Sequence, residues 1–410
     1  MRKSIIIAVT VLMAACSNES TGPDQTPKQI RALTAKEQAL VQANQSFSFN
    51  LLKAVSTTDQ SDNIFISPLS VSMALGMTMN GASGQTYDDM KTALEFAGLT
   101  EAEINRSYQS LMELLTTIDP DVTMEIANSI WVREGFPAEV TFIDTNRHYF
   151  SAEVGERDFG DPATIAEINA WVADNTNNKI QEILTVIPPA AVMYLINAIY
   201  YKAIWQYEFD EKYTGSANFY VTPENPVSVD MMLLTADLNY FTDDRVQVVE
   251  LNYGCGNYTM TIFLPKLPLD INEFLNDLTA EQLDYYLSNL EEKTGTVRLP
   301  RLKTAYKLTL NDVLIQLGMG IAFSDQADFT RINPGGNLFI SRVLHKTFVQ
   351  IDEEGTEAAA VTAVEVSLTS VGPDVDFSLN VNRPYIFLIR EQQTGAILFT
   401  GKIHGPVWED

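Results

Sequence analysis

The stretch that most constrains this chain runs from Asp352 to Pro384 and combines the period of a β-strand with turn residues. Its alanines alone would favour a helix, but the interspersed valines and threonines favour an extended chain. From Thr356 every second residue is small or apolar, whereas the intervening residues include Glu357 and Glu365, so one face suits burial. The later Gly372-Pro373-Asp374 is typical of an exposed turn. The stretch is therefore predicted to be a strand, not yet in a sheet, joined to an exposed loop.

The N-terminus has the parts of a secretory signal peptide, namely a basic start, the apolar run Ile5 to Met13 and the small pair before Cys16. The run is too short to span a bilayer permanently. A cysteine directly after Ala-Ala resembles a bacterial lipobox, with Met13 where leucine is usual. We expect residues 1–15 to be a lipoprotein signal peptide, Cys16 to carry lipid that anchors the protein to a membrane, and residues 16–33 to form a flexible tether. Plain secretion is the alternative.

Composition limits the class of protein and its partners. The chain has 410 residues, 46% of them hydrophobic, which suffices for a large core. Its net charge of −26 repels phosphate backbones, so nucleic-acid binding is excluded as a function. No linker-like stretch divides residues 34–410, and we predict one mixed α+β domain there. Because Cys16 is expected to carry lipid, only Cys255 remains, so no intrachain disulfide is possible, and Cys255 is predicted to be a buried or half-buried structural thiol.

Hydrophobic periodicity predicts the order of the elements. Helices are expected over residues 34–56, 70–81, 86–96, 100–118, 137–150, 165–184, 269–290 and 311–317. Strands are expected over 63–68, 124–132, 193–205, 217–221, 227–233, 237–242, 246–251, 258–264, 295–300 and 338–351, and as a hairpin of 385–390 with 397–403. The run 193–205 is almost continuously apolar, which predicts a central strand buried on both faces.

Residues that could carry catalysis or bind a metal are few. The three histidines, His148, His345 and His404, lack the spacing of a metal site. Gly-x-Ser-x-Gly and phosphate-binding loops are absent from the sequence. Spacing alone leaves a Ser-His-Asp triad open, because such triads assemble in space. We predict that the chain is not an enzyme and uses no cofactor or metal.

Several motifs, in order, resemble the serpin family of serine protease inhibitors across nearly all of residues 34–410. They are Asn63-Ile64-Phe65-Ile66-Ser67-Pro68-Leu69-Ser70, Ile126-Ala127-Asn128, Trp171-Val172-Ala173-Asp174-Asn175-Thr176, Leu195-Ile196-Asn197-Ala198-Ile199-Tyr200, Leu299-Pro300-Arg301, Val343-Leu344-His345-Lys346, Glu353-Glu354-Gly355-Thr356-Glu357-Ala358-Ala359-Ala360 and Asn382-Arg383-Pro384. One departure is Tyr385, where the family usually has phenylalanine, and another is the lipid tether.

The resemblance implies an α+β serpin fold of about nine helices and three β-sheets with an exposed reactive-centre loop. The resemblance also implies that a peptidase cleaves the loop and that the strand-like part then inserts into the main sheet, carrying the acylated enzyme with it. Insertion of about fourteen residues would move the cleaved end by ~45 Å. The resemblance implies a hinge whose small residues favour an inhibitor: Glu353, Glu354, Gly355, Thr356, Glu357, Ala358, Ala359 and Ala360.

Family spacing also predicts the cleaved bond. Counting seventeen residues inclusively from Glu353 gives Thr369, so the predicted bond is Thr369-Ser370. The bonds Leu368-Thr369 and Ser370-Val371 are the alternatives. No lysine or arginine lies between Glu353 and Asn382, which argues against trypsin-like targets. The sequence suits elastase-like or subtilisin-like enzymes, and Leu368 would admit chymotrypsin-like or papain-like ones.

Other family positions are carried over residue by residue. The resemblance places Ser67, Ser70, Asn197 and His345 in the shutter, a polar cluster under the centre of the main sheet, with His345 as a structural gate. It places Trp205 at the breach, where insertion begins, and pairs Arg301 with Glu353 to close that entry point. The expected partners are serine peptidases, with cysteine peptidases as a further option, and a membrane, and the protein is expected to be a monomer. A non-inhibitory surface binding protein is the alternative, and a hydrolase has the weakest support.

Overall fold

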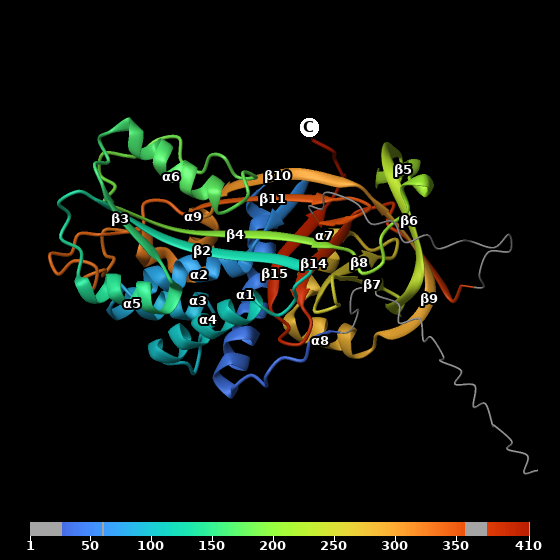
Figure 1. Cartoon of the computed structure of the whole chain (residues 1–410), viewed down its shortest axis with the longest axis horizontal. Coiled ribbons are helices and arrows are strands. Elements are labelled where there is room, and N and C mark those ends of the chain that lie inside the picture. Colours follow the sequence, from blue (N-terminus) through green and yellow to red (C-terminus); the bar gives the residue numbers. More distant parts are fainter. Residues whose placement is uncertain (1–26, 60, 357–374, 410) are drawn as a thin grey trace, which may run out of the picture.

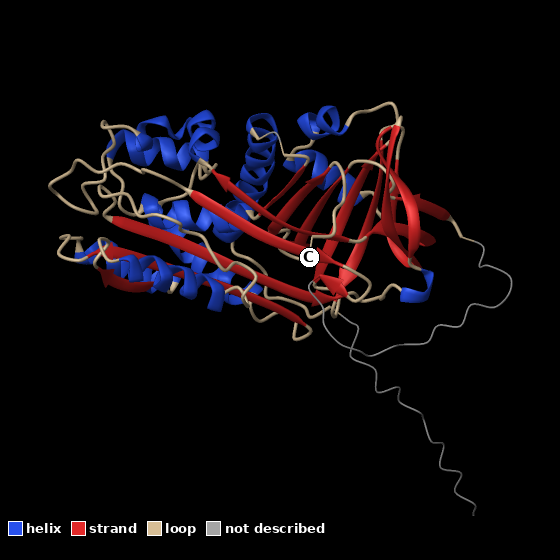
Figure 2. Ribbon diagram, turned by 90° about the horizontal axis from the view of Figure 1, so that it is seen from above, coloured by secondary structure: helices blue, strands red, loops and turns tan. Residues whose placement is uncertain are grey.

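The computed structural model describes residues 27–59, 61–356 and 375–409, and the statements below concern these residues. The chain forms a mixed α+β structure in which most helices gather at one half, while strands dominate the other half (Figures 1 and 2). The helices are α1 (Ala35–Thr58), α2 (Pro68–Met79), α3 (Gly84–Ala93), α4 (Glu101–Leu115), α5 (Val140–Phe150), α6 (Pro162–Asp174), α7 (Ile271–Asp277), α8 (Ala280–Ser288) and α9 (Asn311–Leu314). None of them is long and apolar enough to cross a membrane.

Six strands form what we call the main sheet. Their order across the sheet is β10 (Leu302–Thr309), β11 (Leu344–Ile351), β12 (Gly355–Thr356), β4 (Met193–Ile204), β2 (Val122–Arg133) and β3 (Glu153–Arg157). Helix α2 packs against β4 and against β15 of the second sheet, so it lies in the core between the two sheets. Helix α6 lies with Trp131 and Ile196 in a smaller cluster on the sheet. The main sheet is thus covered differently on its two faces.

The second sheet has nine strands. Its order is β1 (Asn63–Ile66), β15 (Ile397–Ile403), β14 (Tyr385–Glu391), β8 (Tyr258–Pro265), β7 (Val246–Tyr253), β6 (Asn225–Thr242), β9 (Glu291–Pro300) and β13 (Phe377–Asn380), with β5 (Gly215–Thr222) on β6. Strand β6 pairs with β7 only at residues 240–242, whereas its earlier part pairs with β5 and β9. The three sheets that the resemblance implied are therefore joined into two hydrogen-bonded sets through β6.

Local sequence explains how the elements that carry the site begin. Ser67 caps α2, since its Oγ accepts the Ser70 backbone N–H at 3.3 Å, and Pro68 occupies the first helical position. Thr34 and Glu37 form a capping box at the start of α1. The predicted hairpin of β14 and β15 is confirmed as an antiparallel pair. These signals are local, which is why the sequence revealed them.

Four sequence predictions of elements need correction. Helix α6 ends at Asp174, ten residues early, because Asn177 and Asn178 adopt positive φ of 46° and 61°, which asparagine tolerates. The two strands predicted over 227–242 are one strand, β6, since it pairs continuously with β9 from Met231 to Tyr240. The strand expected from 338 begins only at Leu344. Strand β4 alternates between buried and partly exposed residues and is not buried on both faces.

Three strands were not predicted, namely β3, β10 and β13. Part of the expected flexible tether is also ordered on the body of the protein. The Lys28 backbone N–H donates to Asn257 Oδ1 at 2.9 Å, and the Ile30 N–H donates to Gln393 Oε1 at 3.1 Å. These partners lie more than two hundred positions away along the chain, so no local pattern could indicate them.

Candidate functional site

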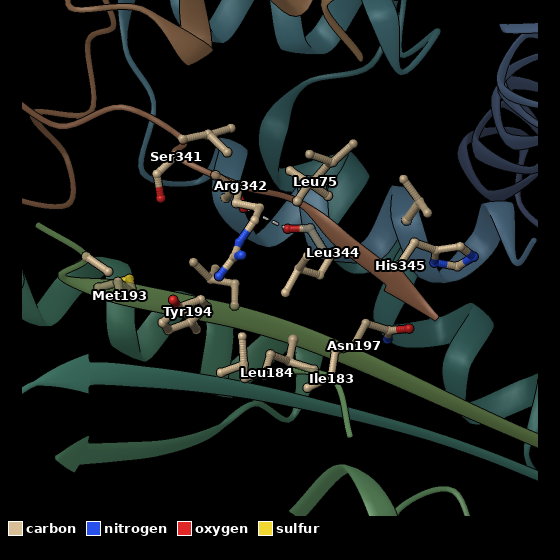
Figure 3. A pocket seen from close by; sticks show the side chains of 18 of the residues that line it. Leu75, Ile183, Leu184, Met193, Tyr194, Asn197, Ser341, Arg342, Leu344 and His345 are labelled. Carbon is tan, nitrogen blue, oxygen red and sulfur yellow. Dashed lines mark hydrogen bonds between the residues drawn. The ribbon is translucent and has the colours of Figure 1, made fainter. Parts of the chain in front are cut away.

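Among the described residues, β4 and β11 of the main sheet do not pair with each other, and we call the space between them the sheet gap. The two-residue strand β12 bridges the gap at one end, where Thr356 pairs with Ala203 of β4 and with Ile351 of β11. Further along the gap, no other described residue pairs with the edges of β4 and β11 that face each other. A cavity of about 310 Å³ lies there, lined by α2, β4, β11 and the connection that follows α6 (Figure 3). The sheet therefore has room for another strand.

The open end of the gap contains the four residues assigned to the shutter. The Ser67 backbone N–H donates to His345 Nε2 at 3.1 Å, and Ser67 Oγ donates to the Leu398 carbonyl at 2.7 Å. Ser70 Oγ lies 3.5 Å from the Asn197 carbonyl oxygen. The structure thus brings together residues from α2, β4 and β11, as the resemblance implied; their gating role stays a prediction.

His345 is a neutral, buried histidine. Burial lowers the pKa of its imidazole to about 4. Its Nε2 accepts a backbone N–H, which requires a free lone pair on that nitrogen. In this state Nδ1 carries the single ring proton and Nε2 is occupied as an acceptor, so the side chain packs as an uncharged group near neutral pH.

Asn197 has one polar atom that is not satisfied. Its Nδ2 donates to Asn128 Oδ1 at 2.8 Å, and Asn128 in turn donates to the Phe150 carbonyl. The buried Asn197 Oδ1 has no hydrogen-bond partner among the described residues. Figure 3 shows the Asn197 side chain on β4, at the same end of the cavity as His345. A buried acceptor without a partner costs roughly 1–3 kcal/mol, so a donor placed beside Asn197 Oδ1 would be favourable.

The closed end of the gap is built around Trp205, the residue assigned to the breach. Its indole Nε1–H donates to the Asp352 carbonyl at 2.8 Å, and its backbone N–H donates to the Glu354 carbonyl at 2.8 Å. The indole stacks on Tyr253 with 4.3 Å between ring centroids. The Tyr253 hydroxyl shares a 2.6 Å hydrogen bond with Thr356 Oγ1, and Thr356 is only 4% exposed. The hinge is therefore fixed by both backbone and side-chain contacts.

Arg301 and Glu353 form an ion pair at this end. Arg301 Nε lies 2.9 Å from each Glu353 carboxylate oxygen, and Nη2 lies 2.8 Å from Oε2. Glu353 is only 3% exposed, its carboxylate also accepts the Thr214 hydroxyl, and its carbonyl accepts the Phe209 N–H. The contact that the resemblance implied is present, and it is a multidentate, charge-assisted one.

Gly355 allows β12 to approach β4. A Cβ atom on Gly355 would lie 2.0 Å from the Ala203 carbonyl oxygen, well inside van der Waals contact. Any other residue would push the two strands apart. The sequence marked Gly355 as part of the hinge, but the reason for glycine is visible only in the structure.

The remaining predicted site residues lie outside the described residues. These are Cys16, Glu357, Ala358, Ala359, Ala360, Leu368, Thr369 and Ser370. The reactive bond and the lipidation site therefore stay predictions.

Sequence reasoning missed several residues that the site uses. Asn128, Tyr253 and Thr214 supply side-chain partners to Asn197, Thr356 and Glu353 respectively. Asn128 stands in one of the family motifs, which is the only signal that could have indicated it. The other two come from the end of β7 and from the residue just before β5, so their proximity to the hinge depends on the fold.

The single described cysteine is inert. Cys255 is buried, and burial raises the pKa of its thiol to about 12, with Asp121 nearby adding to the effect. Asp119, Asp121 and Cys255 are the one trio among the described residues whose ligand atoms lie close enough for a cation, within 4.8 Å. The Asp119 carboxylate already accepts the backbone N–H groups of Cys255 and Asp121 at 3.0 Å. The trio therefore holds a turn in place.

Comparison with known proteins agrees with this geometry. A family model described as "Serpin (serine protease inhibitor)" matches residues 42–406. Iripin-5 from Ixodes ricinus is 34% identical, with 88% of this chain and 93% of Iripin-5 covered. An uncharacterized serpin-like protein from Methanosarcina acetivorans is 32% identical, with 93% and 91% covered.

Solved structures give the same result. The native state of the thermophilic serpin tengpin superposes with a TM-score of 0.82 at 32% identity, with 93% of this chain and 97% of tengpin covered. A thyroxine-binding globulin in complex with thyroxine has a TM-score of 0.81 at 26% identity, with 90% and 100% covered. The chain is therefore a member of the serpin family, with the α+β serpin fold. Serpins are in general protease inhibitors and not catalysts, although some are non-inhibitory.

Proposed function

We propose that this serpin is a suicide-substrate inhibitor of endopeptidases, acting by cleavage of its loop, trapping of the acyl-enzyme and insertion of the cleaved strand into the sheet gap. The observation that carries the proposal is the gap itself. It is bridged at one end by Gly355 and Thr356, the residues from which the strand-like stretch continues. A hinge that already lies in the sheet needs only to be extended.

The register of β12 supports the proposal. Thr356 opposes Ala203 on β4 and Ile351 on β11, and both pairings are antiparallel. Continued along both strands, this register sets Thr362 opposite Asn197 and His345. The residues that would face inward with Thr356 are Ala358, Ala360, Thr362 and Val364, which are small or apolar. An inserted strand would then pair with both open edges and bring a hydroxyl to the orphaned Asn197 Oδ1.

The target class follows from the loop sequence. We place the cleaved bond at Thr369-Ser370 and expect elastase-, subtilisin- or chymotrypsin-like serine peptidases, with papain-like enzymes as a further option. The test is a denaturing gel after incubation with elastase or subtilisin, with trypsin as a control enzyme. A detergent-stable complex is expected, and mass spectrometry of the released peptide identifies the bond. Cleavage of the loop without any adduct, at every enzyme ratio, would exclude the mechanism.

A second candidate function is a carrier, because the structure contains another cavity away from the gap. This cavity measures about 580 Å³ and lies between α1, α8, the β14–β15 turn and residues 30–33. Relatives include a corticosteroid-binding globulin and a thyroxine-binding globulin. A non-inhibitory carrier predicts that cleavage of the loop leaves thermal stability unchanged, whereas insertion predicts a large rise. One melting experiment on cleaved protein separates the two.

We further propose that the protein is an exported lipoprotein of a bacterial cell, anchored through Cys16 and facing the periplasm or the cell exterior. The support is the signal-like N-terminus. Replacement of Cys16 by serine is expected to move the protein from the membrane to the soluble fraction. Continued membrane association of that variant would exclude the anchor.

A further inference from the structure

The C-terminal tail, residues 405–409, lies along the outer edge of the main sheet. The Lys303 backbone N–H on β10 donates to the Val407 carbonyl at 2.8 Å, and the Glu409 N–H donates to the Lys303 carbonyl at 2.9 Å. The Ala305 N–H is directed to the Glu409 carboxylate at 3.3 Å. The tail therefore pairs with β10 like a short additional strand, which covers part of an otherwise open sheet edge.

Trp408 is the central residue of this tail. Its ring lies under two cations, 5.7 Å from the Arg301 guanidinium carbon and 5.7 Å from Lys303 Nζ. These distances are within the range of cation–π attraction. The side chain is 43% exposed, so burial of apolar area accounts for only part of its position.

Arg301 connects this tail to the closed end of the gap. It stands between Pro300, the last residue of β9, and Leu302, the first residue of β10, and its backbone N–H donates to the Asp230 carbonyl at 2.9 Å. The guanidinium therefore has Trp408 near it and the buried Glu353 carboxylate bound to it at 2.8–2.9 Å. Asp230 also lies 3.8 Å from it, a looser contact that could draw the guanidinium outward.

We propose that Trp408 is a positioning residue for the hinge: its ring holds the Arg301 guanidinium against Glu353 and so sets how often the closed end of the sheet gap opens. The planar guanidinium stacks on an aromatic face without losing the donors it directs at a carboxylate. Without the ring, Arg301 is free to turn toward Asp230 and solvent. The consequence for inhibition rests on the proposed loop insertion, but the opening itself is a property of the uncleaved protein.

The test is amide hydrogen exchange of the full-length protein, without any peptidase. The reporters are the N–H groups of Trp205 and Phe209, which donate to Glu354 and Glu353 across the closed end. W408L keeps an apolar side chain but removes the ring. Both reporters are then expected to exchange about fivefold faster, because loss of a cation–π contact of ordinary strength changes an opening equilibrium by about that factor. W408F keeps a ring and is expected to stay within about twofold of the unaltered protein.

Two controls separate positioning from general loosening of the tail. V407A alters the neighbouring tail residue but keeps its backbone bond to Lys303 and leaves the Trp408 ring in place, so it is expected to leave both reporters unchanged. In an Arg301→Met background the ring keeps Lys303 but has no guanidinium to hold against Glu353, so W408L is expected to leave both reporters unchanged. Any of three results would overturn the proposal. Both reporters could exchange in W408L at the rate of the unaltered protein, V407A could have the same effect as W408L, or W408L could have its full effect in the Arg301→Met background. Because no peptidase is present, these results are independent of whether an inhibitory complex forms.

Discussion

The two ends of the sheet gap are built in opposite ways. At the closed end, Glu353, Thr356 and Trp205 each have specific partners, and β12 joins the strands on either side. At the open end, β4 and β11 face a cavity of about 310 Å³, and Asn197 Oδ1 has no partner among the described residues. The same pair of strands is thus satisfied at one end and unsatisfied at the other.

On the proposed mechanism, this difference separates the driving force of insertion from its barrier. Open strand edges and a cavity leave favourable interactions unmade at one end of the gap. An inserting strand would make these interactions, and the polar contacts at the other end would slow its entry.

The largest expected effect comes from breaking the closed end at Thr356. Replacement of Thr356 by arginine would require a charge to enter the sheet interior, where Thr356 now bonds to Tyr253, at a cost of several kcal/mol. The variant is expected to be cleaved as a substrate, with at least about a hundredfold loss of trapped complex on a denaturing gel. Thr356→Ser keeps the hydroxyl and is the matched control. Full inhibition by the arginine variant would contradict insertion through this position.

A second prediction tests the open end through pH. The folded-state pKa of His345 is lowered to about 4, below the ordinary value near 6.5, so the unfolded state binds the extra proton between these values. The contribution of His345 to stability is complete above about pH 6.5 and is lost as pH falls toward 4, by about 3 kcal/mol in total. Denaturant midpoints measured from pH 7 to pH 4 for the unaltered protein and His345→Gln give the difference.

The exposed His148 provides the control for that experiment. His148→Gln is expected to keep the full acid sensitivity of the unaltered protein, because this side chain is exposed and lies outside the open end. Equal pH profiles for the His345 variant and the unaltered protein would show that a charge on His345 does not destabilise the folded state. The prediction that the open end excludes charge would then be wrong.

The smallest expected effect comes from filling the open end. Ala74 of α2 lines the cavity, and Ala74→Leu adds three carbon atoms on a helix that suits leucine. Native stability is expected to rise by about 1 kcal/mol, as a shift in the denaturant midpoint, because part of the void gains contacts. The matched control is Ala39→Leu on α1, outside the cavity. Destabilisation by Ala74→Leu alone would mean that the open end is already packed.

Much of the fold could be predicted from local patterns. The capped start of α1, the helix after Ser67 and the hairpin around Gly395 all depend on residues within a few positions of each other. The end of α6 and the continuity of β6 could not be predicted, because they depend on asparagine conformation and on pairing with a strand about sixty residues away. The docking of Lys28 on Asn257 belongs to the same class of long-range contact.

For the site, the alternation that begins at Thr356, the small residues of the hinge and the polar character of Ser67, Asn197 and His345 could all be read from the amino-acid sequence. These are properties of side-chain size and spacing, which chain order preserves. The sequence did not reveal that Gly355 and Thr356 lie between β4 and β11, or that the C-terminal tail lies beside the pair of Glu353 and Arg301. Each of these contacts joins distant segments that come together only through the packing of the two sheets.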